Sequence, residues 1–161
     1  MSGESNLQVG WIEEIVKRDG DRLFRAAVAI TGNKAEAEDI VQEVFVKLIE
    51  KQPAFESLEH ETAWLIRVAV NLCKNRIRSH WWKKTEPLLN TYPAQDSDEA
   101  DIMQTVLSLP AKYRTVIHLF YYEGYSAKEI AAITEQREAA VRQQLTRARR
   151  MLKDFLEGGF E

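Results

Sequence analysis

Cysteine is almost absent from this chain of 161 residues, because Cys73 is the only one. An internal disulfide is therefore impossible, and a thiolate metal cluster is not expected. No apolar run approaches the roughly 18 residues that cross a bilayer, and residues 1–10 are polar, so we expect neither a membrane span nor a secretion signal. The chain is predicted to be a reduced, cytoplasmic, folded protein.

Patterns of residues that indicate a catalytic site are also missing from the sequence. His60, His80 and His118 have no metal-ligand spacing, and Cys73 has no base close to it in the sequence. The seven glycines are scattered and form no phosphate-binding motif. We therefore expect no catalytic residue, metal site, cofactor or small-molecule substrate, and the chain is not predicted to be an enzyme.

The net charge of −3 conceals an uneven distribution of charge along the chain. Residues 1–84 carry equal numbers of acids and bases, residues 85–105 carry five acids and no base, and residues 106–161 carry nine bases and seven acids. Because a ligand meets a local field, screened within roughly 10 Å, the overall sign does not argue against nucleic acid. Two basic segments separated by an acidic spacer instead favour such a partner.

Apolar residues recur at intervals of three and four throughout, which predicts an all-α fold. A short helix over residues 11–16 is expected to weaken at Asp19 and Gly20, with a second helix beginning at Asp21 and ending before Gly32. Asn33 is expected to cap a third helix that Pro53 ends. A loop over residues 53–61 then precedes a longer helix over about 62–83.

A linker is predicted near the middle of the chain, where residues 86–96 contain two prolines, lack a helical stripe and become acidic. Two small helical domains follow from this division: residues 1–84 and 101–161, joined by a flexible acidic linker over 85–100. Trp81 and Trp82 could pack under this linker or stack near DNA.

The segment after Gly124 has the pattern of a helix-turn-helix. Ser126 and Glu129 have capping-box spacing, residues 134–137 are a polar break, and a long helix over about 138–156 carries arginines and glutamines. Such a helix enters the major groove, where Arg reads guanine and Gln reads adenine. A helical hairpin with a solvated basic face is the alternative.

The order of several motifs resembles that of bacterial RNA polymerase sigma factors. The sequences AEDIVQEVF (37–45) and AWLIRVAVNL (63–72) resemble region two, whereas LPAKYR (109–114), YSAKEIA (125–131) and RARRML (147–152) resemble region four. The short length resembles the extracytoplasmic-function (ECF) group. The family is non-enzymatic by itself: it binds core RNA polymerase, directs it to promoters and helps to open the DNA.

The resemblance implies three sets of site residues. Region two would contact the clamp of the largest polymerase subunit through Asp39, Gln42, Glu43 and Phe45. It would bind and melt the minus-ten element, first as duplex and then as single strand, through Asn71, Lys74, Asn75 and Arg78. Region four would bind the flap of the second-largest subunit, and the minus-thirty-five duplex through Ser126, Arg137, Glu138, Arg142, Gln143 and Arg147.

Some assignments stay open at this stage. Phe45 is equally compatible with core and contact, and Phe55 with a base pocket or a loop anchor. The resemblance also implies an anti-sigma partner, which in this family is often membrane-anchored. Two other functions are compatible with the residues: a helix-turn-helix regulator that acts without polymerase, and an adaptor that binds a protein through its acidic helix without reading DNA.

Overall fold

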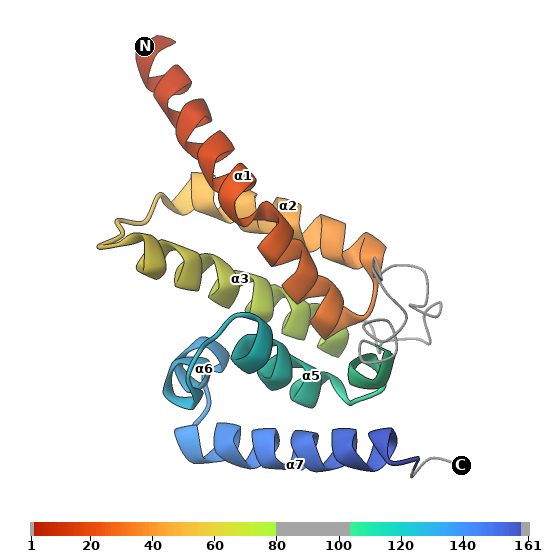
Figure 1. The fold of residues 1–161 in the computed structure, drawn as a ribbon. Coiled ribbons are helices and arrows are strands. Elements are labelled where there is room, and N and C mark those ends of the chain that lie inside the picture. Colours follow the sequence, from red (N-terminus) through yellow and green to blue (C-terminus); the bar gives the residue numbers. More distant parts are fainter. Residues whose placement is uncertain (1, 80–103, 159–161) are drawn as a thin grey trace.

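The computed structural model describes residues 2–79 and 104–158, and within these ranges every regular element is a helix, which confirms the all-α prediction. Figure 1 shows the helices in successive layers, with α1 and α2 at the top, α3 beneath them, α5 and α6 next, and α7 at the bottom. The elements are α1 (Ser2–Thr31), α2 (Lys34–Lys51), α3 (Leu58–Ser79), α5 (Ala111–Ile117), the π-helical turn η2 (His118–Tyr122), α6 (Ala127–Thr134) and α7 (Glu138–Leu156).

The first helix is continuous, so the prediction of a break at Asp19 and Gly20 was wrong. Asp19 is buried and accepts hydrogen bonds from Arg18 of its own helix and from Thr62 of α3. Arg18 also bonds Glu61 of α3. This network anchors a polar residue inside the helix, and it overrides the weak local preference of an Asp-Gly pair for a turn.

The ends of the next two helices follow local signals. Gly32 has a φ of 71°, as expected just past a helix end, and the Asn33 side chain accepts the Glu36 amide hydrogen at the start of α2. Gln52, in the left-handed conformation, ends α2 just before Pro53. The loop that follows is shorter than predicted, since α3 begins at Leu58 rather than near residue 62. Phe55 in this loop is half-buried against Trp64, which favours the anchor over a base pocket.

The front half (α1–α3) and the rear half (α5–α7) pack directly against each other, α5 against α1 and α6 against α3. Their buried apolar side chains form one continuous cluster. Polar contacts add to it: Arg114 of α5 donates to the carbonyl oxygens of Ala29 and Ile30, and Arg22 pairs with the buried carboxylate of Glu123. The sequence did not predict how the two halves are placed relative to each other. The structure shows them in direct contact, an arrangement that we call closed.

Cys73 lies fully buried in this core, and burial raises the pKa of its thiol from the usual value to about 12. We expect a disulfide-exchange reagent at pH 8 to modify it at least ~100-fold more slowly in the native protein than in urea. Rapid labelling of the native protein would contradict the burial.

The same burial makes stability depend on pH. The pKa of Cys73 in the folded protein exceeds the value of about 8.5 in the unfolded chain, so its contribution to stability is full below pH ~8.5 and is lost as the pH rises toward 12. A Cys73→Ala variant should lack this alkaline decline when the free energy of unfolding is measured by urea titration.

Two further expectations concern the whole chain. Among the described residues, no helix is long and apolar enough to span a membrane, and no group of metal-ligating side chains is assembled. The predicted linker over 85–100 and the pair Trp81 and Trp82 lie outside the described residues.

Candidate functional site

An acidic face runs along α2 on the side away from the core. The buried residues Ala37, Ile40, Val44 and Leu48 fix the inward face of this helix, so Asp39 and Gln42 are exposed. The side chain of Asp39 is 58% exposed and that of Glu43 is 44% exposed. Phe45 is partly buried and packs against the core. Three of the four residues predicted to contact polymerase therefore present polar groups to solvent, while the apolar ring of Phe45 is only partly exposed.

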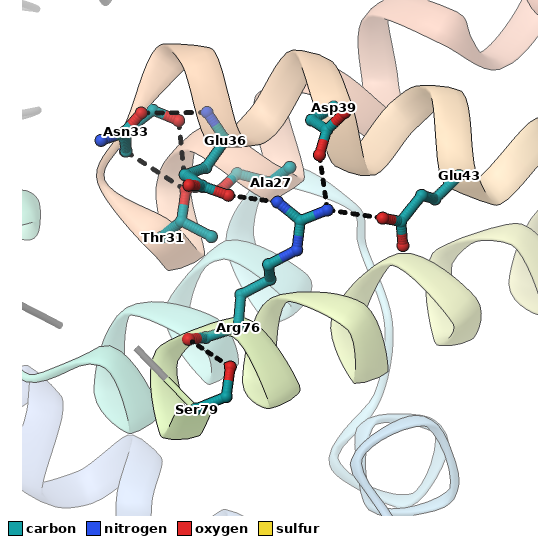
Figure 2. Close-up of polar contacts among 8 residues, drawn as sticks. All are labelled: Ala27, Thr31, Asn33, Glu36, Asp39, Glu43, Arg76 and Ser79. Atoms are coloured by element: carbon teal, nitrogen blue, oxygen red, sulfur yellow. Dashed lines mark hydrogen bonds and ion pairs between the residues drawn. The ribbon is translucent and has the colours of Figure 1, made fainter. Parts of the chain in front are cut away.

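Arg76 of α3 reaches across to this face, as Figure 2 shows. Its guanidinium donates to Asp39 Oδ2 at 2.6 Å and to Glu43 Oε1 at 2.6 Å, and it also bonds Glu36. Burial disfavours the charged form of Arg76, but the hydrogen bonds to Asp39, Glu36 and Glu43 outweigh it, so the pKa of Arg76 is raised. The acidic face is thus a network that joins two helices.

The four residues predicted to bind the minus-ten element share one face of α3. Leu65, Ile66, Ala69, Val70 and Cys73 point into the core and set the rotation of this helix. Lys74, Asn75 and Arg78 are exposed near its C-terminal end, and Asn71 is half-buried one turn earlier. The structure therefore brings these residues together on a cationic surface, with their polar ends available to a nucleic-acid backbone.

The helix-turn-helix is formed by α6, a short turn and α7. Ser126 and Glu129 make both hydrogen bonds of a capping box at the start of α6, as predicted. The turn lacks the glycine that often occupies this place, and Glu135 takes the left-handed conformation there with a φ of 56°. Gln136 fixes the turn by donating to Thr134 and exchanging hydrogen bonds with Gln144 of α7.

The outer face of α7 is cationic and lies in the layer farthest from α2 (Figure 1). Val141, Leu145 and Ala148 are buried, whereas Arg137, Gln143 and Arg147 are exposed. Arg142 is 69% exposed, and its guanidinium is held one turn away by Glu138. The predicted duplex-reading residues from Arg137 to Arg147 therefore lie along one stretch that the contact between the two halves does not cover, and Ser126 is exposed at the N-cap of α6.

Several structural residues escaped prediction because their partners are remote in sequence. Arg76 pairs with α2 over 33 to 40 residues, Arg114 bonds α1 over 84 to 85 residues, and Arg149 donates to the Tyr121 hydroxyl at 2.7 Å. The only available signal was the spacing of Glu36, Asp39 and Glu43, which places three acids on one helix face that must find a counter-charge.

Two family models match this chain. The model described as Sigma-70 region 2 matches residues 15–83, and the model described as Sigma-70, region 4 matches residues 99–152. The chain is 31% identical over 166 residues to the ECF RNA polymerase sigma factor SigW of Bacillus subtilis, covering 89% of this chain and 87% of that protein. It is 29% identical over 168 residues to the ECF RNA polymerase sigma factor SigE of Mycolicibacterium smegmatis, covering 96% of this chain but 65% of that protein.

Two solved structures resemble about nine tenths of the chain. The sigma factor RpoE of Bartonella quintana, in complex with the anti-sigma factor NepR, has a TM-score of 0.76 at 25% identity and covers 90% of this chain and 96% of its own. CnrH, in complex with the cytosolic domain of CnrY, has a TM-score of 0.67 at 25% identity and covers 91% of this chain and 88% of its own.

Proposed function

The chain belongs to the ECF group of RNA polymerase sigma factors, and we propose that its acidic and cationic surfaces are its contacts with polymerase and promoter. A sigma factor of this kind binds core RNA polymerase and directs it to specific promoters. The single observation that carries the assignment is that exposed acids lie on α2 and exposed arginines on α7. Figure 1 shows these two helices at opposite ends of the stack.

The front half is assigned to the polymerase clamp and the minus-ten element. Asp39, Gln42 and Glu43 offer carboxylate and amide groups to a basic protein surface, with Phe45 at its margin. The exposed end of α3 is assigned to the melting strand, because opening DNA requires groups that hold exposed bases and phosphates. Its contacts are Asn71, Lys74, Asn75 and Arg78.

The rear half is assigned to the flap and to the minus-thirty-five duplex. Ser126 lies at the start of α6, and Arg137, Glu138, Arg142, Gln143 and Arg147 lie along the beginning and outer face of α7. Exposed arginines at the start of a recognition helix can reach base edges, while those farther along hold phosphates. Promoter recognition of this kind needs no catalytic group, and it takes place in the cytoplasm.

An anti-sigma protein is the regulatory partner that we propose. The two similar structures are both complexes, one with the anti-sigma factor NepR and one with the cytosolic domain of CnrY. Their likeness extends over nine tenths of this chain, so the closed placement of its two halves is compatible with a form in which a sigma factor is held by another protein. Such a partner would cover surfaces that polymerase or DNA needs, and it can be anchored in a membrane.

Run-off transcription on a randomised promoter pool tests the assignment. Core polymerase with this protein should enrich two conserved sequence blocks upstream of the start site, whereas core polymerase alone should enrich none. The matched arm is purified protein without polymerase on the same pool. Specific retention of duplex in that arm, together with no promoter-dependent transcript in the other, would contradict the proposal and favour a regulator that acts without polymerase.

A further inference from the structure

Arg76 is the one described cation that contacts three carboxylates of another helix. Its side chain extends from the last turns of α3, close in sequence to the buried Cys73, and is 17% exposed. In Figure 2 its guanidinium lies over the first half of α2, where Glu36, Asp39 and Glu43 converge. One terminal nitrogen bonds Glu36, and the other is shared between Asp39 and Glu43.

This arrangement follows from charge and helix geometry. Positions 36, 39 and 43 are spaced by three and four residues, so their side chains lie on one face of α2 and their like charges repel. A guanidinium presents several donors in a rigid fork and can bond more than one carboxylate at once, which an ammonium cannot match. Arg76 therefore neutralises one of three negative charges and leaves two.

The three carboxylates are not equally shielded. The Glu36 side chain is 29% exposed, whereas those of Asp39 and Glu43 are 44% or more exposed. Each of these two carboxylates bonds Arg76 through one oxygen atom. The other oxygen of each remains free of any such bond to Arg76, so a basic side chain from outside can bind without displacing it.

We propose that Arg76 is a positioning residue that holds Asp39 and Glu43 in the geometry in which they bind a basic surface of core polymerase. The inference rests on the proposed function of the acidic face. Because fixed side chains lose less conformational entropy on binding, this preorganisation raises affinity. Arg76 also lies on α3 between Asn75 and Arg78, so it ties the polymerase face to the helix assigned to the minus-ten element.

The affinity for core polymerase without DNA tests this role, measured with fluorescently labelled full-length protein. Arg76→Gln should bind about tenfold more weakly, as expected for loss of a group that orients interfacial charges. Arg76→Lys keeps the charge but not the fork, and its affinity should lie between those of the wild type and Arg76→Gln. Arg25→Gln is the matched control, because Arg25 is exposed on α1 and has no ion pair in the described part of the chain.

A double-mutant cycle separates positioning from a merely structural role. In the background Asp39→Asn with Glu43→Gln, adding Arg76→Gln should weaken binding less than twofold, because the groups it positions are no longer charged. An undiminished tenfold loss in that background would overturn the inference. Wild-type binding by Arg76→Gln in the native background would also overturn it, because Arg76 would then not position the acids. Tighter binding would overturn it too, because Arg76 would then mask the acidic face.

The same set of variants distinguishes failure of the inference from failure of the proposed function. If the doubly neutralised background itself binds polymerase with full affinity, the acidic face is not the polymerase contact, and both the inference and the proposed function of this face are contradicted. If that background binds more weakly while Arg76→Gln binds with wild-type affinity, only the inference is contradicted. Circular dichroism and thermal melting accompany each variant, and if Arg76→Gln unfolds, Arg76→Lys carries the comparison in both backgrounds.

Discussion

Replacing Arg114 with methionine is expected to lower the free energy of unfolding by about 3 kcal/mol, the scale for breaking a buried charged network. Its guanidinium donates to four backbone carbonyl oxygens, two in α1 (Ala29 and Ile30) and two just before α5 (Leu107 and Leu109). Burial lowers the pKa of Arg114, so the hydrogen bonds to these carbonyls are its compensation for lost hydration.

The loss should be large because the carbonyls cannot find substitutes within the structure. Ala29 and Ile30 belong to the last turn of α1, where helix carbonyls have no intrahelical partner. Urea denaturation followed by circular dichroism measures the change, and Arg25→Met on exposed α1 is the control, expected within about 0.5 kcal/mol of wild type. A loss below about 1 kcal/mol for Arg114→Met would show that the closed contact between the two halves is not maintained in solution.

Neutralising Arg142 and Arg147 together should reduce promoter-dependent transcription by roughly 30-fold or more. Each is exposed on the outer face of α7, and a base or phosphate contact of this kind contributes about 1–3 kcal/mol. Arg142→Gln with Arg147→Gln should also reduce the salt dependence of promoter binding by roughly one counterion for each of the two arginines that contacts a phosphate. Affinity for core polymerase in the absence of DNA should remain within about twofold.

Run-off transcription at several salt concentrations measures both effects. The charge-matched control is Lys17→Gln with Arg25→Gln, two exposed bases on α1 that form no ion pair in the described residues. Equal activity of the α7 variant and this control would contradict promoter reading by α7. It would instead favour the adaptor, in which the acidic face binds a protein and the basic helix is merely solvated.

Local signals in the sequence were sufficient where a structure depends on neighbouring residues. The capping box of Ser126 and Glu129, the left-handed Gly32 and the limits of α7 were all predicted and are confirmed. The same reasoning failed at Asp19, where an Asp-Gly pair indicates a break but Thr62 and Arg18 hold the carboxylate inside a continuous helix. The turn predicted over residues 134–137 is confirmed, and Glu135 takes there a left-handed conformation that usually favours glycine.

The candidate site divides in the same way. Helical periodicity was enough to place Asn71 with Lys74 and Arg78 on one face, whereas Asp39 and Glu43 were singled out by the resemblance to the family. The sequence could not predict that Arg76 binds the acids, since nothing local distinguishes Arg76 from its neighbour Arg78. Only packing of α3 against α2 directs one of these arginines to the acidic face and leaves the other exposed.

By itself, the sequence determined the helical fold, the caps at Asn33 and Ser126, the helix-turn-helix and the family, because these depend on spacings of a few residues and on the order of motifs. Tertiary structure alone decided the closed contact between the halves and the partners of Arg76 and Arg114. Their guanidinium groups bond oxygen atoms of α2 and α1 that are 33 to 85 residues away, and such pairings exist only after buried apolar faces have brought the helices together.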